Sequence, residues 1–360
     1  MTNLVQFPGL GLSFELSRVA FSIGGMDIYW YGVCIAFGLC LALVFAFRRC
    51  TEFGIDADSM VDVILIGVVL GIASARLYYV AMAPYNYDTI WDVLAVRDGG
   101  LAIYGAILSS LVVLLLFCHV KKISFLAFAD LGVHGLFIGQ LIGRWGNFMN
   151  VEAYGGPTTL PWRMKLWVSQ YTSIEVHPTF FYESFWNLIG LLLILFIVSK
   201  GRRFDGENTW FYFLWYGLGR SWIEGLRTDS LYLFNWELFG QRIRVSQALS
   251  IVMVVVAAVM LFYNIKIKKR SPEGLWVNQV AAEKARAAAA EAEDAILAET
   301  LLNEEPTQGE AADPVETEAV TAEEVPEETA ETAAEEAPAV ETAPETPAEP
   351  KEDVPHGGEN

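Results

Sequence analysis

Apolar residues in this chain gather into long runs that short polar segments separate. Seven runs approach the roughly 20 residues that a helix needs to cross a bilayer, and they cover about 27–47, 60–80, 101–119, 124–143, 179–199, 209–226 and 245–264. Polar residues interrupt the fourth and sixth runs more than the others. Because the core of a soluble protein rarely needs so many runs of this length, the pattern predicts an all-α membrane protein with seven transmembrane helices.

The basic residues between the runs predict the orientation of the chain. Eleven of them follow the first, third, fifth and seventh runs in short segments: Arg48, Arg49, Lys121, Lys122, Lys200, Arg202, Arg203, Lys266, Lys268, Lys269 and Arg270. Seven lie on the opposite side in longer segments: Arg18, Arg97, Arg163, Lys165, Arg227, Arg242 and Arg244. Since short cytoplasmic segments carry the excess of Lys and Arg, we expect the N-terminus outside and the C-terminal tail in the cytoplasm.

Charge separates the C-terminal part of the chain from the rest. The 360 residues have a formal net charge of −19, yet 271–360 alone hold 25 acidic and 3 basic residues, which leaves +3 for 1–270. We therefore expect a seven-helix membrane domain over 1–270, with a small outer-loop subdomain at about 145–178. The Ala- and Glu-rich stretch 271–303 is a candidate cytoplasmic helix. The Glu/Ala/Pro/Thr repeats of 304–360 predict a disordered acidic tail.

The few cysteines and histidines do not suggest a metal or redox site. The four cysteines have no CxxC spacing, and the four histidines are scattered. We therefore expect reduced structural thiols, no disulfide framework and no metal site. No nucleotide-binding motif is visible either, so the sequence predicts no cofactor and no nucleic-acid partner.

Ionisable residues inside apolar runs are candidate functional residues, because charges at membrane depth are costly and usually face a partner or a cavity. Arg144 and Asn147 stand three residues apart at the outer end of the fourth run, and therefore share a helix face. Asn150 and Glu152 follow as the chain leaves the membrane. In the sixth run, Arg220, Glu224 and Arg227 have spacings of four and three, which again place them on one helix face.

Five further residues are expected at the same outer level, although topology alone does not bring them together: Tyr31, Arg76, Tyr104, His177 and Glu183. Several arginines at headgroup level favour a phosphate ligand, because guanidinium stays charged and binds phosphate bidentately. An outer-leaflet phospholipid carries such a phosphate. If that phosphate is also the leaving group, the arginines stabilise the charge that develops on it.

The segment Gly143–Gly155 reads Gly-Arg-Trp-Gly-Asn-Phe-Met-Asn-Val-Glu-Ala-Tyr-Gly. It resembles the signature of the prolipoprotein diacylglyceryl transferase family at Gly143, Arg144, Gly146, Asn147, Phe148, Asn150, Glu152 and Gly155. The resemblance extends from about Ser22 to Arg270, through Trp30-Tyr31-Gly32, Asp98-Gly99-Gly100, His177-Pro178 and the Arg220–Arg227 block.

The resemblance implies a seven-helix enzyme of the bacterial cytoplasmic membrane with its N-terminus outside. It also implies a reaction in which the diacylglyceryl group of phosphatidylglycerol moves to the lipobox cysteine of a preprolipoprotein, while glycerol phosphate leaves. By the same resemblance, Arg144 and Arg220 are the lipid-phosphate residues. Essential or supporting residues are then Tyr31, Asn147, Glu152, Gly155 and Glu224. Asn150 and His177 complete the substrate-binding residues that we expect.

One departure from the family pattern leaves the general base open. Many members have histidine where this chain has Tyr104, and an unperturbed tyrosine is mostly neutral at pH 7. Three alternatives remain: an arginine-held phenolate of Tyr104, a carboxylate or water as the base, or a Tyr104 that only hydrogen-bonds the substrate. The family usually has proline near His134, and we assign His134 no function.

Structural roles compete with these assignments. Arg144 and Arg220 also suit ion pairs, with Glu224 placed to neutralise Arg220. Arg76 suits snorkelling to the interface, and Tyr31 suits an interfacial aromatic belt. His177 and Asn150 suit helix capping and loop fixing. The rival functions are a transporter or lipid-binding membrane protein, and a receptor that signals through its tail. The polar residues gather at one level, however, and no clear internal repeat is visible.

Overall fold

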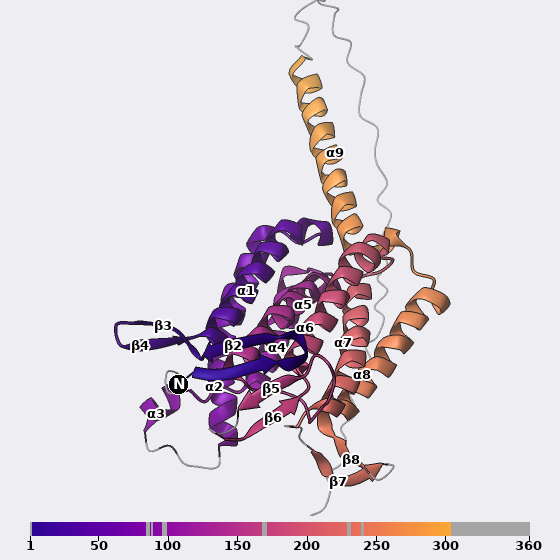
Figure 1. Cartoon of the computed structure of the whole chain (residues 1–360). Coiled ribbons are helices and arrows are strands. Elements are labelled where there is room, and N and C mark those ends of the chain that lie inside the picture. The colour runs from indigo at the N-terminus through magenta and orange to yellow at the C-terminus, as the bar shows by residue number, and fades with distance from the viewer. Residues whose placement is uncertain are drawn as a thin grey trace, which may run out of the picture. The chain divides into compact units, whose positions relative to one another are not determined.

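The computed structural model describes residues 2–83, 87, 89–95, 99–167, 171–228, 232–238 and 241–303. The predicted tail 304–360 and two residues used above, Arg97 and Asp98, lie outside these described residues. Within them the chain is mostly helical (Figure 1).

A helix occupies each of the seven apolar runs. They are α1 (Trp30–Arg49), α2 (Ala57–Met82), α4 (Ile103–Lys121), α5 (Phe125–Asn150), α6 (Thr179–Leu193), α7 (Glu207–Leu226) and α8 (Val245–Phe262). Six of them, with short extensions of α1, α6 and α8, are long and apolar enough to cross a membrane. The exception is α7, which contains Glu207, Arg220 and Glu224.

Polar caps and tight turns set the helix ends. Asp56 caps α2 by accepting a hydrogen bond from the backbone N–H of Ser59, and this bond lowers the pKa of Asp56. Ser124 caps α5 in the same way through Ala127. At its other end α5 stops at Val151, whose φ of 53° is unusual for a β-branched residue. This turn points the chain back towards the last turn of α5.

The interior of the bundle lies around α5, which packs against α1, α6 and α7. Phe137 and Leu131 of α5 are fully buried within two apolar clusters. His134 is also buried there, stacked on Phe45, with one ring nitrogen 3.1 Å from the Ser199 hydroxyl. These contacts give His134 a place in the core, away from the candidate site.

Strands are the feature that an all-α prediction misses. The pairs β3 (Val19–Ile23) with β4 (Met26–Tyr29), and β7 (Tyr232–Leu238) with β8 (Gln241–Arg244), form separate hairpins. A four-stranded antiparallel sheet has the order β2-β1-β5-β6, from β1 (Thr2–Phe7), β2 (Leu12–Ser17), β5 (Met164–Trp167) and β6 (Ser173–Val176). In Figure 1 these strands lie at one end of the bundle, here called the strand end.

The sheet changes the picture of the outer loop. β5 and β6 fall inside the predicted loop subdomain, but β1 from the start of the chain pairs with β5. The loop therefore shares its structure with the first 17 residues. The cause is a pairing between segments about 160 residues apart, which local sequence patterns do not reveal.

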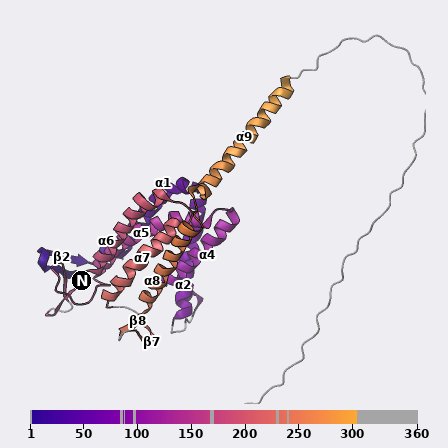
Figure 2. The same ribbon diagram turned by 90° about the vertical axis from the view of Figure 1, so that its right-hand side faces the viewer.

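The remaining elements are short, apart from α9 (Trp276–Asn303), which covers most of the Ala- and Glu-rich stretch. It begins at the opposite end of the bundle from the strands (Figure 2). There the Trp276 backbone donates to Asp205 and its indole N–H donates to the carbonyl of Gly54. The short helices are η1 (Pro8–Leu10), η2 (Cys50–Phe53), α3 (Ile90–Leu94), η4 (Ile194–Val198), η5 (Ser199–Gly201), η6 (Tyr263–Ile267) and η7 (Pro272–Gly274).

Candidate functional site

Glu183, the fifth residue of α6, is the centre of a charged cluster at the strand end. It is 6% exposed and forms an ion pair with Arg144 of α5. Its other carboxylate oxygen lies 3.3 Å from Arg220 Nη1 and 3.3 Å from Arg227 Nη1. One carboxylate thus joins arginines from α5 and from the end of α7. Burial of an unpaired carboxylate is costly, so these pairs also hold the three helix ends in register.

A second glutamate completes the cluster on the α7 side. Glu224 is 1% exposed, and its Oε2 lies 2.6 Å from Arg220 Nη2, one helical turn earlier. Arg244, the residue before α8, donates to the backbone carbonyls of Glu224 and Arg227. The predicted pair of Arg220 and Glu224 is therefore present, and Arg220 bridges two carboxylates.

The signature segment links this cluster to the end of α5. Arg144 Nη1 donates to Asn147 Oδ1 at 3.3 Å, and the Asn147 amide donates to Glu152 Oε1 at 2.9 Å. Asn150 donates to the same oxygen at 3.3 Å. Glu152 is exposed, and two amides orient it. The turn at Val151 allows this chain of bonds, because it returns Glu152 towards the last turn of the helix.

Gly155 and His177 lie where the outer loop meets the start of α6. The Gly155 N–H donates to the His177 carbonyl, and Gly155 forms a β-bridge with Arg227. A Cβ at Gly155 would lie 2.7 Å from His177 Cβ and 3.0 Å from the Leu226 carbonyl oxygen. Only glycine fits this crossing. Nδ1 of the His177 ring lies 3.3 Å from the Tyr182 hydroxyl, and this hydroxyl accepts a hydrogen bond from the Trp162 indole.

Tyr31 packs against the signature helix. A Cβ at Gly146 would lie 2.8 Å from the Tyr31 ring, so glycine permits this contact. Tyr31 also lines an open hollow of about 500 Å³ together with Arg18, Asp27, Ile28, Tyr29, Gly32 and Asn150. Asn150 therefore lines the hollow and also donates to Glu152, which is linked through Asn147 to the charged cluster.

Tyr104 and Arg76 reach the same end of the bundle but belong to another group of residues. Among the described residues, no hydrogen bond or ion pair connects Tyr104 with the Glu183 cluster. Its ring lies 6.4 Å from that of Tyr78, and the residue is 63% exposed. Arg76 is 8% exposed and donates to four backbone carbonyls, those of Asp92, Val93, Gly99 and Gly100. Arg76 thus holds α3 and Gly99–Gly100 against α2 and does not snorkel.

Comparison with known proteins places this site in a family. A family model described as prolipoprotein diacylglyceryl transferase matches residues 18–263. The chain belongs to this family. A relative from Lysinibacillus sphaericus is 40% identical over 268 residues, covering 71% of this chain and 96% of the relative. A relative from Finegoldia magna is 39% identical over 256 residues, covering 71% and 97%.

These relatives, and one from Clostridium perfringens that is 36% identical over 269 residues, are named phosphatidylglycerol–prolipoprotein diacylglyceryl transferases. Family membership confirms the resemblance read from Gly143–Gly155 and identifies the chain as a transferase. With its apolar helices and bacterial relatives, it is a multi-pass membrane protein of bacteria. The Glu183 cluster lies within the matched part, whereas the β1–β2 hairpin and α9 lie outside it.

The sequence predicted Glu183 at the same end of the helices as Arg144 and Arg220 but gave it no role. Nothing in the sequence around Glu183 shows that its carboxylate meets arginines from two other segments. Arg244 was counted only as a loop charge. The described residues contain no group of three or more His, Cys, Asp or Glu side chains suited to hold a metal ion.

Proposed function

We propose that this chain transfers the diacylglyceryl group of phosphatidylglycerol to the lipobox cysteine of a preprolipoprotein, the first step of bacterial lipoprotein maturation. The carbon–oxygen bond between the glyceryl carbon and the phosphate breaks, and a carbon–sulfur bond forms. Glycerol phosphate leaves, and the thiol proton passes to a base. The observation that carries the proposal is the arginine cluster around Glu183, at the end of the signature helix.

The charge of the cluster suits a phosphodiester. Three arginines and two glutamates give Arg144, Arg220, Arg227, Glu183 and Glu224 a combined formal charge of +1. A phosphodiester carries one negative charge, and the leaving phosphate monoester carries more. The interaction with the arginines therefore strengthens as the bond breaks, which is what stabilisation of a transition state requires. Arg144 and Arg220 hold the phosphate in this proposal.

Glu152 is the group that we assign to the thiol proton. Of the three glutamates in the cluster and the signature segment, Glu183 and Glu224 are paired with arginine, whereas the two amides of Asn147 and Asn150 hold Glu152. Glu152 has no ion pair among the described residues, so its carboxylate is available to take the thiol proton. Tyr104 is left to contact the substrate, because it lies outside this hydrogen-bonded chain.

The remaining site residues have positioning roles in the proposal. Tyr31 and Asn150 line the hollow beside Glu152 and contact the substrate there. Glu224 orients Arg220. Gly155 and His177 fix the crossing of the outer loop over the start of α6, and so hold Glu183 in place.

The placement in the membrane follows from packing and charge. We infer that α7 is the seventh span, because its charged side chains are paired within the protein: Arg220 with Glu183, and Glu207 with Arg203. The strand end faces outward and the α9 end faces the cytoplasm, which agrees with the excess of basic residues there. The membrane domain then covers 1–270, and α9 and the acidic segment 304–360 are cytoplasmic.

The test is transfer by the purified full-length chain. Phosphatidylglycerol and a lipobox peptide are incubated with the protein, and the mass of the peptide is followed. We expect a gain of one diacylglyceryl group on the cysteine, with glycerol phosphate released in equal amount. A well-folded protein that leaves the thiol unmodified would contradict the proposal.

A further inference from the structure

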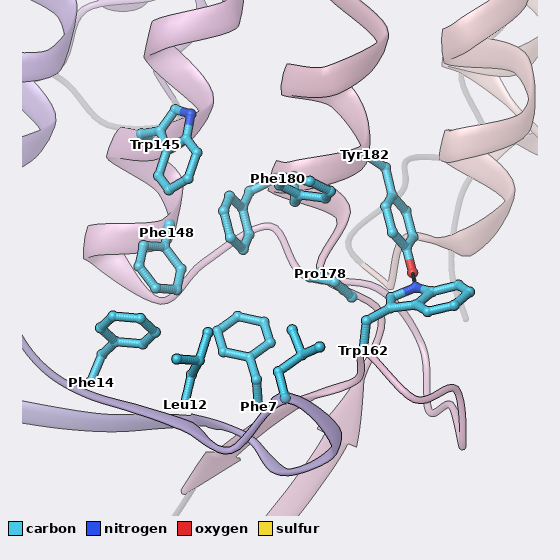
Figure 3. A pocket seen from close by; sticks show the side chains of 11 residues that line it. Phe7, Leu12, Phe14, Trp145, Phe148, Trp162, Pro178, Phe180 and Tyr182 are labelled. Atoms are coloured by element: carbon cyan, nitrogen blue, oxygen red, sulfur yellow. Dashed lines mark hydrogen bonds between the residues drawn. The ribbon is translucent and has the colours of Figure 1, made fainter.

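An apolar groove lies beside the charged cluster and plays no part in the proposed chemistry. It has a volume of about 470 Å³ and lies between the β1–β2 hairpin and the ends of α5 and α6 (Figure 3). Phe7, Leu12 and Phe14 of the hairpin form its floor in Figure 3. Trp145 and Phe148 of α5 and Phe180 of α6 form the opposite wall.

The groove is preformed. Phe148 stacks on Phe180 with ring centroids 4.5 Å apart, and Phe14 meets Phe148 edge-on at 6.1 Å. The floor is fixed as well, because β1 pairs with β2 on one side and β5 on the other. The hairpin turn lies so close to the outer loop that a Cβ at Gly9 would overlap the Pro161 carbonyl oxygen. A ligand would therefore meet an ordered surface and cause little loss of entropy.

The polar atoms of the lining already have partners. The Trp145 indole donates to the Ser184 hydroxyl at 3.1 Å, and the Trp162 indole donates to the Tyr182 hydroxyl at 2.8 Å. Yet the apolar lining is open, since Leu12 is 48% exposed and Phe14 is 40% exposed. Contiguous apolar surface of this kind marks an interaction site. Binding is therefore driven by burial of apolar groups of the ligand, and the ligand needs no hydrogen bond from the lining.

The groove and the charged cluster lie at one level of the same two helices. Trp145 directly follows Arg144 in α5, and Tyr182 directly precedes Glu183 in α6. Neighbouring residues of a helix differ by only about 1.5 Å along its axis. A substrate whose reactive atom lies at the cluster therefore has its adjoining groups within reach of the groove.

We propose that this groove binds apolar side chains next to the cysteine of the acceptor, an inference that rests on the proposed function. Signal peptides carry an apolar segment of about 7–15 residues shortly before their processing site. If this segment is helical in the membrane, it satisfies its own backbone and presents only side chains. Its last apolar residues then reach the interface together with the thiol.

The position of the groove favours side chains of the acceptor over a lipid acyl chain as its ligand. Its walls are the last turns of α5, which ends at Asn150, and the first turn of α6, which begins at Thr179. Acyl chains extend along the spans through a core about 30 Å thick. A groove at the helix ends follows the interface instead. Its hairpin floor also lies before residue 18, outside the part that the family model matches.

The test compares Leu12→Asp with a matched control, Ile23→Asp. Both residues lie exposed on N-terminal hairpin strands, and Ile23 is 62% exposed on β3, away from the groove. We expect Leu12→Asp to raise KM for the lipobox peptide about tenfold, because burial of an apolar side chain is lost. Its kcat and its KM for phosphatidylglycerol should stay within about twofold of wild type, and Ile23→Asp should change none of these constants.

Two results would overturn the inference. A rise in KM for phosphatidylglycerol alone would assign the groove to an acyl chain, and equal behaviour of the two variants would remove the groove from substrate binding. Leu12→Trp fills the groove without adding charge and should reproduce the tenfold rise if Leu12→Asp unfolds. Inactive wild-type protein would count against the proposed function instead.

The acceptor provides an independent check. Peptides in which the apolar residues before the cysteine are replaced by serine should show about a tenfold higher KM with wild type. With Leu12→Asp the same replacement should cost less than about twofold, because the contact has already been lost. Additive losses in variant and peptide would contradict direct contact.

Discussion

Two arginine sites lie at the strand end of this protein, and they differ in what their arginines contact. Arg76 donates to four backbone carbonyls, which are neutral and fixed in the segment before α4. Arg144 and Arg220 instead contact the carboxylate of Glu183, a side chain from another helix. The first site uses its guanidinium to build structure. The second concentrates positive charge around one anion.

The difference teaches that membrane depth alone does not identify a functional charge. By position in the sequence, Arg76 and Arg144 look alike, since we expected each near the outer end of a long apolar run. A guanidinium saturated by carbonyls has little capacity for a ligand, whereas an ion pair can exchange one anion for another. The predictions below test this distinction, from the largest expected effect to the smallest.

Arg144→Gln should lower the initial rate of diacylglyceryl transfer by about 1,000-fold. The substitution removes a donor to the phosphate and leaves Glu183 with one arginine fewer, and loss of a single charge-stabilising donor costs about 10²–10³ in rate. Arg163→Gln is the matched control, because Arg163 pairs with Glu175 on the sheet, 2.5 Å apart and partly exposed. A rate for Arg144→Gln above half that of wild type would show that the cluster is structural, like the Arg76 site.

Glu152→Gln should lower kcat by about 100-fold, within the range for loss of a general base. Glutamine keeps the shape and the contacts to Asn147 and Asn150 but accepts no proton. Tyr104→Phe is the comparison, and it should retain at least about half of the wild-type kcat. The reverse outcome, with a large loss only for Tyr104→Phe, would assign the proton to the phenol.

Arg76→Met should lower the free energy of unfolding by about 2–4 kcal/mol, because hydrogen bonds from a buried charged group to four carbonyls are lost. The folded fraction should keep its KM for phosphatidylglycerol within about twofold. Denaturant unfolding in detergent micelles measures the first quantity, and transfer assays measure the second. A large rise in KM with unchanged stability would place Arg76 in the lipid site.

His177 should give the smallest effect, seen only in the pH dependence of stability. Partial burial lowers the pKa of His177 below its usual 6.5, so the unfolded chain takes up this proton first as pH falls. The stability that neutral His177 contributes is fully present above pH about 6.5 and decreases below it. Thermal unfolding of His177→Gln between pH 7.5 and 5.5 should show a flatter profile than wild type, and parallel profiles would contradict this.

The helices could be predicted from the sequence because their signal is local. Each apolar run contains a helix. Only α7 is less apolar than a membrane span usually is, and the bundle accommodates its charged residues because they form ion pairs. The strands could not be predicted in this way. β1 pairs with β5 across about 160 residues of sequence, and β5 is only four residues long.

Most residues of the candidate site could be named from the sequence, but the central role of Glu183 could not. The spacing of Arg144 and Asn147 predicted a shared helix face, and the structure links both to Glu152 by a chain of hydrogen bonds. Glu183 acquires its position only when α5, α6 and α7 pack together. Tyr104 is the opposite case. It stands where many family members have histidine, yet it lies outside the hydrogen bonds of the Glu183 cluster.

The central claim is that the Glu183 cluster holds the phosphate of the donor lipid. Its most direct test is the equilibrium binding of phosphatidylglycerol to the full-length protein in bilayer discs of zwitterionic lipid. Arg220→Gln should raise the Kd at least about tenfold, while Arg163→Gln should leave it unchanged. An unchanged Kd for Arg220→Gln would contradict the account.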